Sequence, residues 1–506
     1  MSALKASEFI YEQPSASGIK YTFKHALSQE VAYNSLLIER RKQLHERAAQ
    51  AIESTLVDHL DEHLAELAHH YSRCDNVSKA IEYLGRVGQQ AWQRAAYADA
   101  ISNFHAAIEL LQRMPDSPQR TRQELLLQLG IGPALITAKG YSAQEVEQAF
   151  TRAQQLCQRL GDPPQLFHAL FGLLFVHLLR LDTSAAYQLA GRLQRLAQAA
   201  DESGLLVLAH LASGNVFLIM GDPLGARRHL EIAISLYDPE RHRQLTSLGG
   251  DVRVNPRSVL GWTLFWLGYP DQALKLCNEA LAIAQSGTSR HSQAFAEAYL
   301  ADLHSFRREA HLTQESAERL IVLASEHGFP IWRAIGTTLR GWCIAVQGHY
   351  DEGIALIREG SNSVRSAGIT ARGLNDLFLL AGACLEAGHI SEGLDTLTEA
   401  RALVSQPEHP VLGVIELFKG NLLSKWGGSR AAEAEDCFRA AIEIARKFNN
   451  KMAELQAISG LARLLASHGD RDEARTMLAE IYNWFTEGFG TPDLKDAKLL
   501  LDELSV

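Results

Sequence analysis

The stretch SVLGWTLFWLGYPDQALKLCNEALAIA, residues 258–284, decides the fold of this chain. Its first half places small and apolar residues on one helical face, and Gly268-Tyr269-Pro270 then breaks the helix. Its second half repeats apolar residues at positions i, i+3, i+4 and i+7, which is the spacing of an amphipathic helix. The stretch therefore predicts two antiparallel helices joined by a tight turn.

The spacing of small residues in this stretch recurs along the chain. Gly261, Ala273 and Ala280 are separated by twelve and seven positions. The same spacing occurs in Gly88/Ala100/Ala107, Gly214/Ala226/Ala233 and Gly341/Gly353/Gly360, and more weakly from Ala68, Ala381 and Ala462. Because glycine inside a helix costs about 1 kcal/mol relative to alanine, we expect these residues to mark points where paired helices touch. The recurrence predicts an all-α, right-handed superhelix of roughly ten helical hairpins.

A breaker glycine also recurs, five residues before the second small position. It is found at Gly221, Gly268, Gly348, Gly388 and Gly469. Together with the small residues, this pattern resembles the tetratricopeptide repeat, in which a Gly-aromatic turn joins two closely packed helices. The period is often forty residues, as between Gly353 and Gly393, instead of the family's usual length of about thirty-four, so helices longer than usual are expected.

Two irregular spacings interrupt the repeat. Ala226 and Ala273 are forty-seven residues apart, which predicts an inserted loop over Asp238–Arg257. Ala80 and Ala100 are only twenty apart, so either one helix serves two registers or it is kinked. Loops of this length are often functional, and His242, Asp251 and Arg253 are its candidate polar residues; a plain connector is the alternative.

Composition restricts the class of protein. Of the 506 residues, 46% are hydrophobic and 21% charged, as in ordinary folded domains. We expect no transmembrane helix and no signal peptide, because neither a long apolar run nor a basic leader is visible. The formal net charge of −10 argues against nucleic acid as a partner. Six scattered cysteines without a C-x-x-C pair indicate buried thiols in the cytoplasm.

The segment Tyr21–Ile52 does not follow the repeat. It contains the string FKHALSQEVAYNSLL, residues 23–37, followed by a helix rich in basic residues. This string resembles the end of the winged-helix region that follows the nucleotide-binding core in signal-transduction ATPases with numerous domains. The match is closest to bacterial proteins that join a class III adenylate/guanylate cyclase, such an ATPase core and a tetratricopeptide tail. Residues 237–274, 328–342 and 481–504 also look like that tail.

The resemblance implies a domain division and a regulatory role. Residues 1–56 would be a winged-helix remnant and linker helix, 57–484 the repeat solenoid, and 485–506 a C-terminal capping helix in which Thr491 is the N-cap. The G-x-x-x-x-G-K-[ST] loop of the ATPase core is absent from the sequence, so this chain corresponds to a truncated, split or separately encoded tail. We expect a non-enzyme with no cofactor, whose partner is a protein or peptide, with the family's own ATPase or cyclase domains as candidates.

Two polar clusters offer alternative chemistry. His59, His63 and His70, with two glutamates, would share one helix face and could hold zinc, although a solvated face explains them as well. The basic run Arg40-Arg41-Lys42 could touch nucleic acid, but Glu39 and Glu46 neutralise much of it. We therefore expect no metal site, no catalytic residue and no nucleic-acid binding.

The most promising site is a stripe beside the small residue of each first helix. In a solenoid these helices line the concave side, and aromatic residues dominate binding hot spots. The candidate groove residues are Phe175, Leu218, Trp262, Phe265, Trp266 and Trp342. The alternative is that tightly wound repeats bury this stripe as core. A free-standing adaptor, a sensor domain of a transcription regulator and a metal-dependent enzyme are the rival functions.

Overall fold

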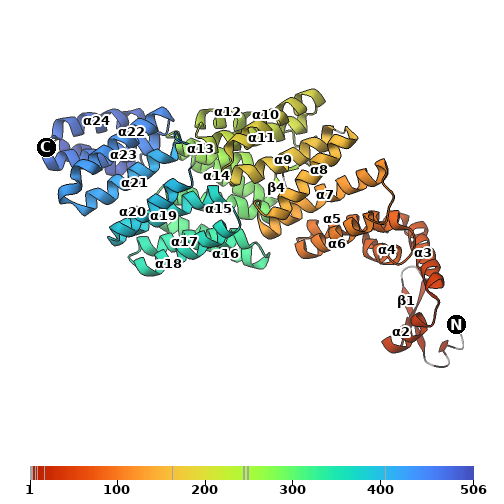
Figure 1. Cartoon of the computed structure of the whole chain (residues 1–506). Coiled ribbons are helices and arrows are strands. Elements are labelled where there is room, and N and C mark those ends of the chain that lie inside the picture. Colours follow the sequence, from red (N-terminus) through yellow and green to blue (C-terminus); the bar gives the residue numbers. More distant parts are fainter. Residues whose placement is uncertain are drawn as a thin grey trace. The chain divides into compact units, whose positions relative to one another are not determined.

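The computed structural model describes residues 4–5, 7, 9–15, 18–161, 163–242, 245–247, 250–404 and 406–505. The chain forms two compact units, residues 1–131 and 132–506. Consecutive helices in both units pack as antiparallel hairpins, which is the predicted all-α, tetratricopeptide-like arrangement (Figure 1). The boundary between the units falls inside one helix, immediately before Gly132 and Pro133. Proline removes a backbone donor there, which weakens the helix locally.

Unit 1 begins with a β-hairpin that was not predicted from the sequence. Its elements are β1 (Ile10–Ser15), β2 (Gly18–Phe23), α2 (Ala26–Asn34), α3 (Ile38–Thr55), the 3-10 helix η1 (Val57–Glu62), α4 (Leu64–Tyr71), α5 (Val77–Gln93), α6 (Tyr97–Leu111) and α7 (Pro118–Lys139), which continues into unit 2. The strands are antiparallel, with Ile10 opposite Phe23. Aromatic and β-branched residues such as Ile10, Tyr11 and Phe23 favour a paired strand, so this short hairpin is a local exception within the predicted all-α fold. The assignment of this segment to a winged helix stays a prediction.

A partly buried carboxylate fixes α3 against the first repeat helices. Glu53 accepts hydrogen bonds from the hydroxyls of Tyr71 and Tyr83, each at 2.5 Å, and from Lys79 Nζ at 3.0 Å. Burial opposes ionisation, but these donors outweigh it and hold the pKa of the Glu53 carboxyl below its ordinary value. Residues 1–56 and the first repeats thus share unit 1, while the predicted division between them stays a prediction.

The structure answers two questions about the start of the array: how Ala80 and Ala100 are related, and whether the histidines share one helix face. Ala80 and Gly88 lie in the single helix α5, which pairs with α4 on one side and with α6 on the other. The histidine run does not form one helix face, because His59 has non-helical backbone angles in η1 and α4 begins only at Leu64. His70 instead contacts His45, with 2.9 Å between their Nδ1 atoms. Among the described residues, no cluster of three or more ligands suits a metal ion.

Unit 2 continues the hairpins with helices that are mostly 17 or 18 residues long. They are α8 (Gln144–Leu160), α9 (Pro163–Leu179), α10 (Thr183–Ala200), α11 (Ser203–Met220), α12 (Pro223–Leu236), α13 (Val254–Trp266), α14 (Pro270–Ser286), α15 (Arg290–Phe306), α16 (Ala310–Glu326), α17 (Pro330–Val346), α18 (Tyr350–Ser366), α19 (Thr370–Ala387), α20 (Ile390–Ala402), α21 (Val411–Trp426), α22 (Ala431–Lys447), α23 (Lys451–His468), α24 (Arg471–Trp484) and α25 (Pro492–Leu504). The short strands β3 (Thr246–Ser247) and β4 (Gly250–Asp251) and the 3-10 helix η2 (Gly428–Arg430) complete it. The predicted insertion, Asp238–Arg257, lies between α12 and α13 except for residues 254–257, which already form the first turn of α13.

The small residues lie where paired helices touch, as predicted. A Cβ on Gly341 would come within 2.8 Å of the carbonyl oxygen of Gly353, and a Cβ on Gly353 within 2.6 Å of the Gly341 oxygen. A Cβ on Gly261 would lie 3.1 Å from the carbonyl oxygen of Ala273. In these hairpins the two helices meet backbone to backbone, and at Gly341 and Gly353 only glycine leaves room for that approach.

The breaker glycines end the first helices in the left-handed region. Gly268 has φ +92° and Gly348 has φ +97°, conformations that side-chain-bearing residues rarely adopt. The chain therefore reverses direction within about two residues and starts the second helix at once. The recurring glycine five residues before the small position is thus a helix stop.

Thr491 occupies the N-cap of α25, but its hydroxyl donates to the carbonyl oxygen of Gly488 at 2.7 Å instead of capping the helix.

By length and composition, the apolar helix α11 could cross a membrane, although 61% of it is buried in the array, as in a core helix. The six cysteines are free, and all but Cys74 are buried.

The glycine contacts predict a substitution effect of definite sign. Gly353→Ala should lower the free energy of unfolding by about 1–3 kcal/mol, because the added methyl meets backbone atoms that cannot move independently. Gly191→Ala in α10 is the matched control, since its Cβ would meet only the Arg195 side chain at 3.7 Å. There the gain in helix propensity, up to about 1 kcal/mol, should prevail. Urea unfolding of both variants checks this; equal stability changes would contradict the packing role.

Candidate functional site

A cavity of about 730 Å³ lies within unit 2, on the inner side of its helical array. Its wall is built from the first helices of successive hairpins: α11, α13, α15, α17, α19, α21 and α23. The volume falls in the range of ligand-binding pockets, about 300–1,000 Å³. The inner helices therefore line an open pocket large enough for a ligand.

The cavity exists because the array closes on itself. Helix α13 contacts α23, five hairpins later along the chain. At another contact, His409 Nε2 lies 2.8 Å from the carbonyl oxygen of Ile219, and Pro410 packs on Gly221. A side chain at Gly221 would collide with that proline ring. Segments nearly two hundred residues apart in sequence therefore seal the wall.

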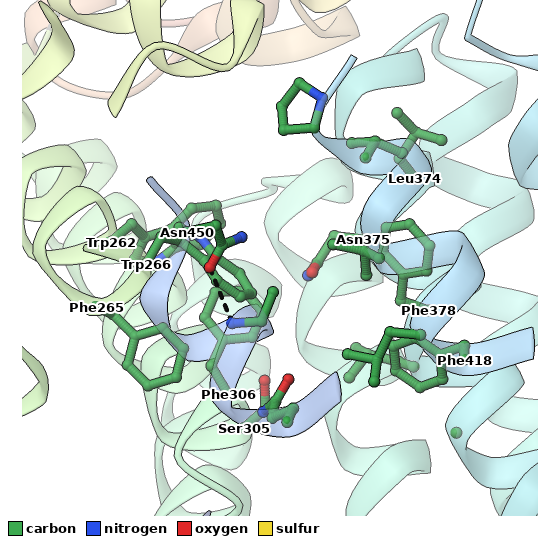
Figure 2. A pocket seen from close by; sticks show the side chains of 18 of the residues that line it. Trp262, Phe265, Trp266, Ser305, Phe306, Leu374, Asn375, Phe378, Phe418 and Asn450 are labelled. Atoms are coloured by element: carbon green, nitrogen blue, oxygen red, sulfur yellow. Dashed lines mark hydrogen bonds between the residues drawn. The ribbon is translucent and has the colours of Figure 1, made fainter. Parts of the chain in front are cut away.

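Two aromatic walls face each other across this space (Figure 2). The first wall comes from α13 and α15: the rings of Trp262 and Trp266 lie 5.3 and 5.0 Å from the ring of Phe306. The second comes from α19 and α21, where Phe378 and Phe418 stack at 5.7 Å. Such rings supply large apolar contact areas with little loss of side-chain freedom.

A buried charge cluster holds the two walls together. Arg372 of α19 forms an ion pair with Asp302 of α15 and with Asp376, 3.0 Å from Nε to Oδ1. Burial raises the pKa of Asp376 to about 6 and also raises that of Asp302, although Arg372 attracts both carboxylates. Asn375, which lines the cavity, donates to Asp302 at 3.4 Å. The cluster thus spans from one wall to the other and orients a polar cavity residue.

The predicted groove residues divide unevenly. Leu218, Trp262, Phe265, Trp266 and Trp342 all line the cavity. Phe265 is only 1% exposed and Trp342 9% exposed, whereas Trp262 and Trp266 are partly accessible, so the stripe is core at some positions and wall at others.

Phe175 lies elsewhere. It is buried in α9 against Phe171, with ring centroids 5.2 Å apart, and borders a separate void of about 20 Å³ beside His291. It does not line the large cavity. A role of the other five residues in binding stays a prediction.

The second wall, on α19 and α21, was not predicted from the sequence. The residues that it adds are Leu374, Asn375, Phe378, Gly382, Leu385, Glu386, Val414, Leu417, Phe418 and Asn421. Three of these residues could have been found from the spacing. Trp262, Phe265 and Trp266 are one, four and five positions after the small residue Gly261. The same positions after Ala381 are Gly382, Leu385 and Glu386. Phe378 and Phe418 precede their small residues, so that rule misses them.

The candidate loop residues hold the insertion in place. His242 is buried, and its Nε2 lies 2.8 Å from Ser203 Oγ while its Nδ1 accepts from the Asp238 amide at 3.0 Å. Asp251 and Arg253 pair with each other, with Nε 3.0 Å from Oδ1, which raises the pKa of the Arg253 guanidinium. None of the three lines the large cavity, and a binding role for them stays a prediction.

Comparisons with known proteins add little about activity. No family model matches the chain. An uncharacterized protein of Rhizobium meliloti (strain 1021) is 23% identical over 460 residues, covering 87% of this chain and 44% of the relative. The chain thus spans less than half the length of this relative.

Solved structures are similar only at the level of helical repeats. A Rap protein complexed with Competence and Sporulation Factor matches with a TM-score of 0.44 and 10% identity, over 67% of this chain and 97% of that one. The apo quorum sensor NprR from B. thuringiensis gives 0.43 and 12%, over 73% and 99%. Yeast Tom70 gives 0.33 and 12%, over 91% and 96%. With TM-scores this low, no functional conclusion rests on these likenesses.

The charge cluster yields a prediction about stability. Arg372→Met should lower the free energy of unfolding by about 3–5 kcal/mol near neutral pH, because two buried carboxylates lose their cation. The loss should shrink toward about pH 5, where these raised-pKa carboxyls take up protons and no charge stays buried.

Arg227→Met is the control for that experiment, since Arg227 forms a more exposed i,i+4 pair with Glu231; it should cost less than about 0.5 kcal/mol at either pH. Urea titrations at the two pH values provide the measurement. A pH-independent loss at Arg372 would show that the effect is packing and not charge.

Proposed function

We propose that this chain is a non-catalytic recognition scaffold that binds a short, largely apolar peptide segment in the cavity of unit 2. The observation that carries the proposal is the pair of facing aromatic walls, Trp262, Trp266 and Phe306 against Phe378 and Phe418. Apolar walls of this kind take up aliphatic or aromatic side chains.

The polar lining favours a peptide over a purely apolar ligand. Asn375, Asn421 and Asn450 line the cavity, and each carboxamide has the donor and acceptor character of a peptide group. Side-chain amides spaced along an apolar surface can therefore pair with an extended backbone while its side chains enter the walls. The volume admits a short segment and excludes a folded domain.

The proposal extends to the context of the chain. The string at residues 23–37 supports a regulatory tail of a cyclase-linked signal-transduction ATPase in the cytoplasm, in which peptide binding changes the state of the attached enzyme. A free-standing adaptor or the sensor domain of a transcription regulator are the alternatives. Sequencing the gene region upstream of this chain distinguishes them, since a P-loop and a cyclase frame are expected only in the first case.

Gly382 offers a direct test of the cavity. It lines the space, and a Cβ there would meet only Phe418 Cε1 at an ordinary 3.5 Å. Gly382→Trp should therefore fill the cavity without disturbing the helix backbone and reduce peptide affinity by at least about tenfold, whereas Gly382→Ala should bind as the wild type does.

The measurement is affinity selection from a pooled library of short synthetic peptides, followed by calorimetry of the best binders. Thermal unfolding of both variants verifies that they fold. Equal binding by the wild type and the Gly382→Trp variant, or no peptide retained by the wild type, would contradict the proposal.

A further inference from the structure

Three segments far apart in sequence meet at one edge of the cavity. They are the α13–α14 turn with the first residues of α14, Pro270 and Asp271, the α15–α16 turn at Arg307 and Arg308, and residues 487–496, which end in the first turns of α25. We call Glu487, Gly488, Asp493 and Asp496 of that last segment the C-terminal latch. The hydrogen bonds and ion pairs of these residues hold them to the two turns, while the apolar face of α25, with Leu494 and Ala497, is buried in the core.

Glu487 closes one side of the latch. Its carboxylate accepts from the backbone amides of Asp271 and Gln272, at 2.9 and 3.0 Å, at the start of α14. In return, Asp271 Oδ2 accepts from the Gly488 amide at 2.9 Å. A carboxylate at a helix N-terminus satisfies free amides and matches the helix dipole, so the latch supplies a cap that α14 does not provide from its own sequence.

Arg308 closes the other side. Its Nη1 lies 2.8 Å from Asp496 and 3.3 Å from Asp493, which also accepts from Gln456 Nε2 at 3.0 Å. Arg308, Gln456, Asp493 and Asp496 all line the cavity. The ion pairs are thus part of the cavity wall, where a bound molecule would touch them.

The same turn connects the latch to the aromatic wall. Phe306, which contacts both Trp262 and Trp266, is two residues before Arg308. Between them, the buried Arg307 donates to the carbonyl oxygen of Pro270 at 2.7 Å. Arg308 itself has φ +57°, a left-handed conformation uncommon for a residue with a side chain. The aromatic wall and the residues that hold the latch therefore lie on the same short turn, residues 306–308.

We propose that the C-terminal latch is the gate of the cavity: it opens to admit ligand and closes around it, so that ligand occupancy sets the position of α25. This proposal rests on the proposed function only where it concerns ligand binding. Opening of the latch is expected in the chain without any ligand. In the closed state the wall is complete at Asp493 and Asp496, and in the open state α25 separates from the two turns.

The first experiment measures the latch without ligand, by hydrogen exchange of the whole chain followed by mass spectrometry. Arg308→Asp should speed exchange in residues 492–504 at least about fivefold, because three carboxylates then face one another. Aspartate tolerates the left-handed backbone. Exchange in α17 and α18, which are distant from the latch in sequence, should not change and serves as the folding reference.

A charge swap separates electrostatics from general damage. Arg308→Asp combined with Asp496→Arg restores an ion pair of reversed polarity and should return exchange of residues 492–504 to near the wild-type rate. Unchanged exchange in the single variant, or no recovery in the double variant, would overturn the gate. A global rise that includes α17 and α18 would also count against it.

The second experiment follows entry of the uncharged apolar dye N-phenyl-1-naphthylamine by stopped-flow fluorescence, so that the charge change in Arg308→Asp does not itself repel the probe. Association should be several-fold faster in Arg308→Asp than in the wild type, and Gly382→Trp should abolish the cavity-dependent phase. Equal association rates would contradict gating. A dye signal that is unchanged in Gly382→Trp would contradict the proposed binding cavity. The hydrogen-exchange result tests the latch independently of that outcome.

Discussion

Backbone-to-backbone contact within each helical hairpin is the constraint on which the rest of this structure depends. At Gly341 and Gly353 the paired helices approach so closely that a single methyl group would collide with main-chain atoms. Such contacts fix how each pair packs, and in a repeat array small, uniform rotations between neighbours add up to a superhelix. The packing of each hairpin in unit 2, and so the position of the inner helices that line its cavity, depends on residues with little or no side chain.

Closure of the superhelix turns a repeat array into a binding site. Successive hairpins bring α13 into contact with α23, and the inner helices then face one another across about 730 Å³. The Asp302–Arg372–Asp376 cluster holds the opposed walls, and the C-terminal latch completes the edge. A charged cluster inside an apolar wall contributes little net stability, but it fixes the relative position of α15 and α19.

Much of the fold could be predicted from the sequence, because its determinants are local. The hairpin over residues 258–284, the helix stops such as Gly268 and the insertion before α13 all follow from spacing and turn chemistry. The β1–β2 hairpin was missed because its residues lie beside a longer helical pattern. The Thr491 hydroxyl was misassigned because its partner, the Gly488 carbonyl, depends on the conformation of the preceding loop.

Only one of the two aromatic walls of the candidate site could be predicted from the sequence. Trp262 and Trp266 stood out as aromatic residues beside a small one, but nothing local shows that Phe378 and Phe418 face them, since that juxtaposition depends on the accumulated curvature of several hairpins. The same holds for Arg308 and Asp493, which are 185 residues apart.

A crystal structure of the chain with its tightest-binding short peptide tests the central claim most directly. The peptide should lie between the α13–α15 and α19–α21 walls, with its side chains on Trp266 and Phe378 and its backbone within hydrogen-bonding distance of Asn375 or Asn421. A peptide bound instead on the outer helices α12, α14 or α16, with the cavity unchanged, would contradict it.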